Sequence, residues 1–231
     1  MPLISEKEKA EALGIPVPNI VFYGPPGTGK TYLAKALARE LELPIVRLSG
    51  NDVQSKWINE SPQKIKNLFE EAQTVATNAG GAIVFLDELD AVLKSRDGAG
   101  RAHEEDNKVV AEFLTHLQET AEDDILFIGA TNRMEVLDEA VIRSGRIDKK
   151  IHVGRPDQEA RKAILQAQLA DRPHALSDEA VEYVAAITEG LIAADLAELT
   201  IEAARFSVFS RGDDEVRWED VKHALNDWRN N

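Results

Sequence analysis

A glycine-rich stretch between an apolar run and a helical pattern constrains this chain of 231 residues more than any other feature. Residues Gly24–Thr31 read Gly-Pro-Pro-Gly-Thr-Gly-Lys-Thr, which fits the pattern G-x-x-x-x-G-K-[ST]. The glycines allow the backbone to wrap so that its N–H groups point inward at phosphate oxygens, and a helix behind the loop adds the positive end of its dipole. The alternative, an ordinary Gly-Pro turn, is disfavoured because the apolar run Ile20–Tyr23 precedes the stretch and a helical pattern follows it.

This loop predicts that the chain binds a nucleoside triphosphate together with Mg²⁺. Lys30 would supply a positive charge for the β- and γ-phosphates, and Thr31 would supply a hydroxyl ligand for Mg²⁺. The predicted nucleotide-binding residues of this stretch are Gly24, Pro25, Pro26, Gly27, Thr28, Gly29, Lys30, Thr31 and Tyr32.

Short apolar runs alternate with helical patterns over the first 156 residues, which predicts an α/β fold with a parallel sheet sandwiched by helices. Each expected strand is brief and apolar, as strands buried on both faces should be. The five expected strands are Ile20–Tyr23, Ile45–Leu48, Ala82–Leu86, Ile125–Gly129 and Lys150–Val153. Helices are expected at about Lys30–Leu41, Pro62–Thr77, Asp106–Thr120 and Asp138–Arg143. In the first of them, the four-residue spacing of Leu33, Leu37 and Leu41 predicts a stripe against the sheet.

The pattern changes after Pro156, where only helical signals follow. Helices are expected at about Gln158–Ala170, Asp178–Glu189, Ala194–Ser210 and Glu219–Arg229. Asp157 and Ser177 are placed as N-caps, and Gly190 as a C-terminal stop. We therefore predict a P-loop α/β domain over residues 1–154 and a small all-helical lid domain over residues 157–231, with a hinge near Gly154–Pro156.

Polar residues follow two of the predicted strands. Asp87 and Glu88 end an apolar run, and at the end of a parallel strand such a pair faces the ligand crevice. Asp87 would hold Mg²⁺ through water, and Glu88 would act as general base toward the attacking water. Asn132 follows the strand Ile125–Gly129, and its amide could hold that water and sense the γ-phosphate. The alternatives are a solvated turn at Glu88 and an Asx turn at Asn132.

Composition excludes several classes of protein. Asp and Glu total 41 against 27 Lys and Arg, a formal net charge of −14, so nucleic acid is an unlikely partner. The absence of cysteine excludes a disulfide scaffold and a thiolate metal site, and fits a cytoplasmic location. No stretch approaches the roughly 18 apolar residues that predict a membrane span, and no signal peptide is expected in residues 1–7.

The motifs taken together resemble the AAA ATPase family. The stretches that carry the resemblance are Gly24–Thr31, Phe85–Glu88, Gly129–Asn132 and Arg143–Asp148. The resemblance implies ATP as the nucleotide, and it implies that Arg143 and Arg146 are arginine fingers that reach the γ-phosphate bound by a neighbouring subunit. It therefore implies a homo-oligomer, a hexameric ring when ATP is bound. The alternative is that both arginines pair with surface acids.

The stretch Ser55–Ser61 resembles the first pore loop of this family, and its sequence is most similar to the katanin, spastin and vacuolar sorting ATPase branch. The resemblance implies that Lys56, Trp57 and Ile58 contact a polypeptide substrate in the axial channel of the ring. A tryptophan gives rigid contact area that is indifferent to substrate sequence. The alternative is a core position for Trp57. The loop Ser95–Asp106 would be a second pore loop.

The resemblance also places Ala194 in the nucleotide site. Family members have glycine where this chain has Ala193, and the added methyl group is expected to crowd the nucleotide and reduce its affinity. Further departures are a lead-in of only 23 residues before Gly24, Asn59 in place of a pore-loop glycine, and Gln168 in place of a histidine that contacts the base.

The function expected from the sequence is Mg²⁺-dependent ATP hydrolysis by a ring-forming module, coupled to remodelling, unfolding or translocation of a polypeptide. Two alternatives remain open. One is an ATP-binding assembly switch with little turnover. The other is a nucleic-acid motor or loader, which the net charge of −14 and the tryptophan in the pore-loop stretch disfavour.

Overall fold

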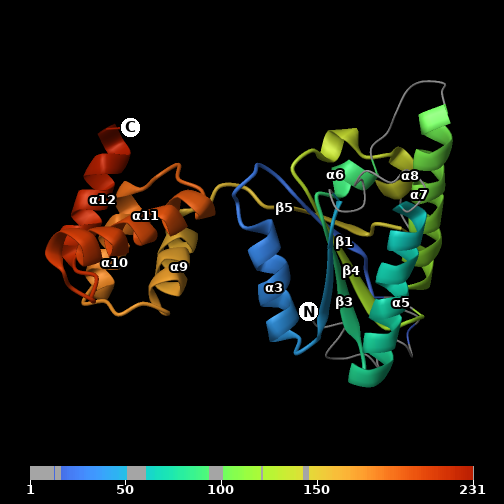
Figure 1. Ribbon diagram of the computed structural model, residues 1–231, viewed down its shortest axis with the longest axis horizontal. Helices are drawn as coiled ribbons and strands as arrows, with labels where there is room; N and C mark the ends of the chain where they lie inside the picture. Colours follow the sequence, from blue (N-terminus) through green and yellow to red (C-terminus); the bar gives the residue numbers. More distant parts are fainter. Residues whose placement is uncertain are drawn as a thin grey trace. The chain divides into compact units, whose positions relative to one another are not determined.

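The computed structural model describes residue 13 and residues 17–50, 61–93, 101–120, 122–142 and 146–230. Contacts group the chain into two compact units (Figure 1). The first contains the chain up to Gly24 together with Lys30–Val153, and the second contains Gly154–Asn231 together with the loop residues Pro25–Gly29. Among the described residues, none of the helices combines the length and the apolar character that crossing a bilayer requires.

The first unit is built on a five-stranded parallel sheet, which confirms the predicted fold class. Its strands are β1 (Ile20–Tyr23), β2 (Ile45–Ser49), β3 (Ala82–Asp87), β4 (Ile125–Thr131) and β5 (Lys149–His152), in the spatial order β2-β3-β4-β1-β5. β1 is bounded as predicted, and the ends of the other four strands are displaced by one or two residues. β3 and β4 continue into Asp87 and Thr131, because pairing between parallel strands extends beyond their apolar runs.

Helices cover both faces of this sheet (Figure 1). The helix α3 (Lys30–Glu40) lies on one face, and α5 (Ser61–Ala79) and α7 (Arg101–Glu119) lie on the other. The edge-to-face rings of Phe113 and Phe127, with centroids 5.2 Å apart, join α7 to β4. Three short elements complete the unit: α6 (Leu89–Val92), the 3₁₀ turn η1 (Met134–Val136) and α8 (Glu139–Ile142).

The expected leucine stripe of α3 is confirmed for Leu37 and Leu41, which pack against the core beside the sheet, and is wrong for Leu33. Ala34 and Ala38 are the apolar residues of α3 that are buried, with 0% and 4% of their surface exposed, whereas Leu33 is 39% exposed. The small alanine side chains allow α3 to pack closely on the aromatic and branched residues of β1, β3 and β4. Leu37 and Leu41 flank this contact and are partly buried.

The second unit is helical apart from its loops. Its elements are α9 (Gln158–Leu169), α10 (Asp178–Ile187), α11 (Ala193–Phe206), the π-helical turn η2 (Ser207–Arg211) and α12 (Trp218–Asn230). The predicted N-caps are confirmed, because Asp157 accepts a hydrogen bond from the Ala160 amide and Ser177 accepts one from the Ala180 amide. The helix expected to reach Ser210 instead becomes π-helical at Ser207 and ends at Gly212, whose φ is 67°.

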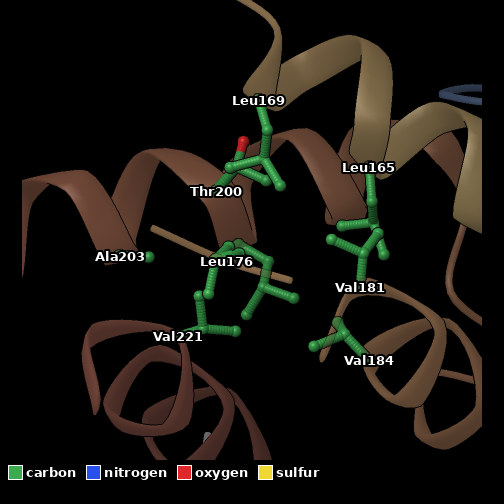
Figure 2. Close-up of a pocket in the computed structure, with 9 residues that line it drawn as sticks. Leu165, Leu169, Leu176, Val181, Val184, Thr200, Ala203 and Val221 are labelled. Atoms are coloured by element: carbon green, nitrogen blue, oxygen red, sulfur yellow. The ribbon is translucent and has the colours of Figure 1, made fainter. Parts of the chain in front are cut away.

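The core of the second unit is apolar and holds one small cavity of about 10 Å³ (Figure 2). Side chains from α9, α10, α11 and α12 and from the loop before α10 point into it. The lining residues are Leu165, Leu169, Leu176, Val181, Val184, Leu199, Thr200, Ala203 and Val221. The Thr200 hydroxyl donates to the Ala197 carbonyl, so it adds no unpaired polar group to the core.

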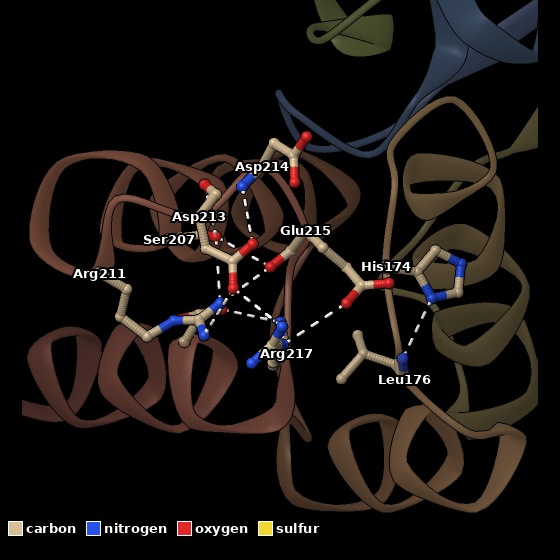
Figure 3. A network of polar contacts seen from close by, with 9 residues as sticks. His174, Leu176, Ser207, Arg211, Asp213, Asp214, Glu215 and Arg217 are labelled. Carbon is tan, nitrogen blue, oxygen red and sulfur yellow. Dashed lines mark hydrogen bonds and ion pairs between the residues drawn. The ribbon is translucent and has the colours of Figure 1, made fainter.

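A polar network connects η2 with the loop before α12, where the side chains of Arg211 and Arg217 both contact Asp213 (Figure 3). The guanidinium of Arg211 donates two hydrogen bonds to the carboxylate of Asp220, at 2.7 and 2.9 Å, and the Asp220 side chain is fully buried. This hydrogen bond raises the pKa of Arg211. Burial alone would raise the pKa of Asp213, but Arg217 and Arg211 outweigh it and lower that pKa. The turn at η2 brings Arg211 within hydrogen-bonding distance of Asp220 in the first turn of α12, and these bonds stabilise the turn.

Candidate nucleotide site

The phosphate loop follows β1 directly and needs glycine where its backbone approaches other segments. Gly24 has a φ of 145°, and a Cβ placed on it would lie 2.3 Å from the carbonyl oxygen of Val153. Gly27 has a φ of 74°, a backbone conformation that residues with a side chain rarely adopt. At these two positions a side chain would strain the backbone or clash with a neighbouring segment, so the loop presents backbone atoms there.

Lys30, the first residue of α3, folds back over the loop. Its side chain is buried, and its Nζ donates a hydrogen bond of 2.9 Å to the carbonyl oxygen of Gly24. Burial lowers the pKa of Lys30, although the negative charges of Asp87 and Asp90 act in the opposite direction. An anionic phosphate beside Nζ would offset the cost of burying this cation, so the charge of Lys30 fits a nucleotide in the loop.

Thr31 and Asp87 place two oxygen atoms side by side. The Thr31 Oγ1 donates a hydrogen bond of 2.7 Å to Asp87 Oδ2, although the two residues lie on different elements, α3 and β3. Hydroxyl and carboxylate oxygens suit Mg²⁺, which keeps several of its waters and needs few protein ligands. The described residues contain no group of three or more His, Cys, Asp or Glu that could hold a metal ion. The Thr31 and Asp87 oxygens fit Mg²⁺ held largely through water and phosphate oxygens.

Glu88 sits in a strained turn after β3. Its φ of 52° and ψ of 48° are left-handed, an uncommon conformation for a residue with a side chain. The Ser49 hydroxyl donates a hydrogen bond of 2.8 Å to Glu88 Oε2. A Cβ on the adjacent Gly50 would lie 2.2 Å from the Glu88 carbonyl oxygen, so only glycine fits there. The end of β2 is thus shaped to receive Glu88, which sequence reasoning missed because a Ser-Gly pair after a strand carries little signal by itself.

The strand order brings the polar strand ends to one edge of the sheet. β4 lies between β1 and β3, and Tyr23 of β1 is opposite Thr131 of β4. The loop that follows β1 and Asn132, which follows β4, therefore leave the sheet at the same edge as Asp87 and Glu88. The Asn132 side chain is exposed at that edge.

Among the other predicted site residues that the structure describes, Arg146 does not lie at this edge of the sheet. Arg146 lies shortly before β5, near the strand beginnings, because Asp148 donates its amide to the Asn19 carbonyl just before β1. This is the edge opposite the phosphate loop. The predicted residues that lie outside the described part of the chain are Lys56, Trp57, Ile58 and Arg143.

Two further predicted nucleotide-binding residues are described. Tyr32 is 57% exposed on α3. The backbone amide of Ala194 donates a hydrogen bond of 3.0 Å to the carbonyl oxygen of Gly27, and contacts group both residues in the second unit. The methyl group of Ala193 is 3.6 Å from the point where a Cβ on Gly29 would lie.

Comparison with known proteins agrees with the motifs. The model of the "ATPase family associated with various cellular activities (AAA)" matches residues 20–155. The cell division cycle protein 48 homolog of Archaeoglobus fulgidus is 38% identical over 203 residues, which are 87% of this chain and 27% of that protein. The ATP-dependent zinc metalloprotease FtsH of Lactiplantibacillus plantarum is 38% identical over 204 residues, again 87% of this chain and 27% of the relative.

A third relative, the ATP-dependent zinc metalloprotease FtsH 1 of Conexibacter woesei, is 37% identical over 204 residues, which are 87% of this chain and 30% of that protein. The chain thus spans less than a third of the length of each of these relatives. They are of the CDC48 and FtsH kinds, so the finer likeness to the katanin branch stays a prediction. Because the family model covers more than half of the chain, the chain belongs to the AAA family of ATPases, enzymes that hydrolyse ATP with Mg²⁺.

Proposed function

We propose that this chain is the ATPase module of a ring-forming machine that hydrolyses ATP and uses the cycle to remodel, unfold or translocate a polypeptide. The observation that carries the proposal is the convergence of the phosphate loop, Asp87, Glu88 and Asn132 at one edge of the sheet. Membership of the AAA family supports the same reaction. Assembly, substrate and partners are parts of the proposal.

Binding begins with the loop and Lys30. The loop amides and the N-terminus of α3 would receive the β-phosphate, and Lys30 Nζ would exchange the Gly24 carbonyl for phosphate oxygens. Thr31 and Asp87 would hold Mg²⁺, whose charge neutralises the phosphate oxygens as negative charge develops.

Hydrolysis then requires a base and an aligned water. Glu88 would take a proton from the water that attacks the γ-phosphorus, while Ser49 holds one oxygen of its carboxylate in place. The amide of Asn132 would hold the same water and contact the γ-phosphate. The bond from γ-phosphorus to the bridging oxygen breaks, so the products are ADP and inorganic phosphate.

A neighbouring subunit would complete the site. Because Arg146 lies near the strand beginnings, at the edge opposite its own phosphate loop, it is badly placed to serve its own nucleotide. A guanidinium supplied by another subunit stabilises the charge of the transition state. We assign this role to Arg146 and, from the motif alone, to Arg143. A closed ring, hexameric with ATP, would satisfy every such site.

A polypeptide is the proposed substrate. Two of the relatives are by name ATP-dependent metalloproteases, and proteases act on polypeptides. We propose that Lys56, Trp57 and Ile58 grip the substrate in the axial channel. The net charge of −14 opposes a nucleic-acid track.

The test is steady-state ATP hydrolysis by the wild type, by Glu88→Gln and by Glu71→Gln, an exposed residue of α5 that loses the same charge. Loss of a general base should lower kcat by roughly 10²–10⁴-fold. We expect Glu88→Gln to show this loss and to keep its affinity for an ATP analogue, and Glu71→Gln to match the wild type. Turnover by Glu88→Gln at the wild-type rate would exclude Glu88 as the base.

One observation favours a second candidate, an ATP-binding assembly switch with little turnover. The family resemblance implies glycine at the position of Ala193, and the methyl group of Ala193 lies 3.6 Å from the point where a Cβ on Gly29 of the phosphate loop would stand. The same assay separates the two candidates. If the wild type binds nucleotide but hydrolyses it no faster than ATP decays spontaneously, the switch replaces the motor.

A further inference from the structure

Two linked hydrogen bonds involve the residues on either side of Asn132, and one of them reaches the helix α6. Asp90, on the short helix α6, accepts a hydrogen bond of 2.6 Å from the Thr131 hydroxyl at the end of β4. The same hydroxyl oxygen accepts a hydrogen bond of 2.9 Å from the backbone amide of Arg133. Thr131 is 1% exposed, so water has little access to compete for either bond.

The two bonds define the backbone on both sides of Asn132. A hydroxyl group has one proton, and Asp90 Oδ1 receives it, which turns the oxygen lone pairs toward the Arg133 amide. The resulting turn from Thr131 to Arg133 spans Asn132. Asp90 therefore sets the orientation of the hydroxyl that fixes the backbone carrying Asn132.

Asp90 also lies two residues after Glu88. α6 follows the left-handed turn of Glu88 at once, and the Ala91 amide donates a hydrogen bond of 2.8 Å to the Glu88 carbonyl. Leu89 is fully buried, and a Cβ on Gly129 of β4 would lie 2.9 Å from its Cδ2. β4 thus leaves room for Leu89, and α6 packs on the strand that directly precedes Asn132.

We propose that Asp90 is a positioning residue of the site, which acts through Thr131 to hold Asn132 in register with Glu88. The inference rests on the proposed function, in which Asn132 contacts the γ-phosphate and Glu88 activates water. Asp90 touches neither nucleotide nor water in this account. Its role is to join the two strand ends that must act together.

The key variant is Thr131→Val, which keeps the shape of the side chain and removes the hydroxyl. We expect kcat to fall about tenfold, as for the loss of one buried hydrogen-bond pair. ADP affinity should change less than twofold, because Asn132 senses only the γ-phosphate. The preference for a non-hydrolysable ATP analogue over ADP should fall with kcat. Thr131→Ser restores the hydroxyl and should restore both quantities.

A matched control tests whether loss of any buried threonine hydroxyl has the same effect. Thr120 is also 1% exposed, and its one hydroxyl proton is shared between Asn19 Oδ1 and the Leu117 carbonyl, away from the strand ends that form the site. Thr120→Val should lower the free energy of unfolding as Thr131→Val does, and leave kcat and the ATP-analogue preference unchanged. Equal losses of kcat in both variants would mean that Thr131 has only a structural role.

Asp90 is tested by a double-mutant cycle. Asp90→Ala and Thr131→Val remove the same bond, so the double variant should be no worse than either single variant. In the nucleotide-free protein, both single variants should speed hydrogen exchange of the Arg133 amide, which loses its fixed acceptor. Additive losses, or unchanged exchange at Arg133, would overturn the proposal.

Comparing the wild type, Thr131→Val and Thr131→Ser tests the positioning role of Asp90 separately from the proposed hydrolysis of ATP. If the wild type has no turnover but Thr131→Val loses the preference for the ATP analogue and Thr131→Ser keeps it, the positioning role holds and the proposed hydrolysis fails. If the wild type turns over and Thr131→Val keeps both its kcat and its preference, the positioning role fails and the proposed hydrolysis stands.

Discussion

Single residues of the site are held by short contacts that cross between neighbouring elements. Thr31 bonds to Asp87, Ser49 bonds to Glu88, and Thr131 bonds to Asp90, each between a hydroxyl and a carboxylate at 2.6–2.8 Å. A charge-assisted bond of this kind is short and about twice as strong as a neutral one. The carboxylates of the strand ends are therefore oriented before any nucleotide binds.

A second prediction for a single residue concerns Gly24 of the phosphate loop. Gly24→Ala should abolish nucleotide binding and destabilise the fold, because its φ is 145° and the new methyl group would meet the Val153 carbonyl. Gly80→Ala is the control, since its φ of 74° is also positive but nothing lies within 4 Å of its Cβ position. The control should cost about 1–2 kcal/mol from its backbone alone. Gly24→Ala should cost roughly 1–3 kcal/mol more from overpacking.

Urea unfolding and binding of a fluorescent ADP analogue measure the two effects. Equal destabilisation by the two variants, with nucleotide binding intact in Gly24→Ala, would show that the close approach of the loop to Val153 is not required.

Motif spacing predicts the residues of the site that follow one another in sequence and misses those that meet only in space. Lys30 and Thr31 are fixed by their distance from the loop glycines, so the sequence reveals them. Ser49 and Asp90 act on Glu88 and Thr131 from other elements, at sequence separations of 39 and 41. No local pattern encodes those pairings, which depend on strand order and register.

Elements of secondary structure are positioned by pairing and by polar anchors as well as by periodicity. α11 continues into the π-helical turn η2 because Arg211 reaches Asp220 in the first turn of α12. The Asp220 carboxylate also accepts a hydrogen bond of 2.7 Å from the Arg217 amide, at the start of α12. One buried carboxylate therefore fixes the angle between two segments.

The buried carboxylate of Asp220 leads to a prediction about the packing of η2 and α12. Asp220→Ala removes three hydrogen bonds from a fully buried carboxylate and should lower the free energy of unfolding by on the order of 3 kcal/mol. Asp214→Ala removes the same charge from an exposed site nearby and should be nearly neutral. Urea unfolding followed by circular dichroism compares the two. Equal midpoints would show that the network contributes nothing to stability.

Strands and helices with strong apolar patterns were predictable, and their ends and faces were less so. β1 is bounded as predicted because a turn motif follows it at once. The stripe of α3 was misjudged at Leu33 because leucine spacing suggests a buried face, whereas close packing on the sheet selects Ala34 and Ala38. The end of α11 was misjudged because the chain continues beyond Phe206 as a π-helical turn, whose last residue, Arg211, pairs with Asp220 of α12.

We propose that the molecule has an incomplete catalytic site by itself. The edge that carries the loop, Asp87, Glu88 and Asn132 would contain the nucleotide machinery, and Arg146 lies at the opposite edge. A ring of copies would bring one edge of each subunit to the other edge of its neighbour. This arrangement is our proposal.

The most direct measurement mixes two inactive variants and follows ATP hydrolysis. Arg146→Ala keeps its own Glu88 but offers no arginine, and Glu88→Gln offers the arginine but has no base. We expect each alone to lose at least about 10³-fold or 10²-fold, respectively. In a mixed ring, Glu88 of one variant meets Arg146 of the other, so activity should return.

The control mixes Arg146→Ala with the double variant Glu88→Gln/Arg146→Ala, which has no arginine to donate and should restore nothing. Recovery in the first mixture alone would establish a catalytic site shared between subunits. Wild-type turnover by Arg146→Ala alone, or no recovery in mixtures shown by sedimentation to co-assemble, would contradict the account.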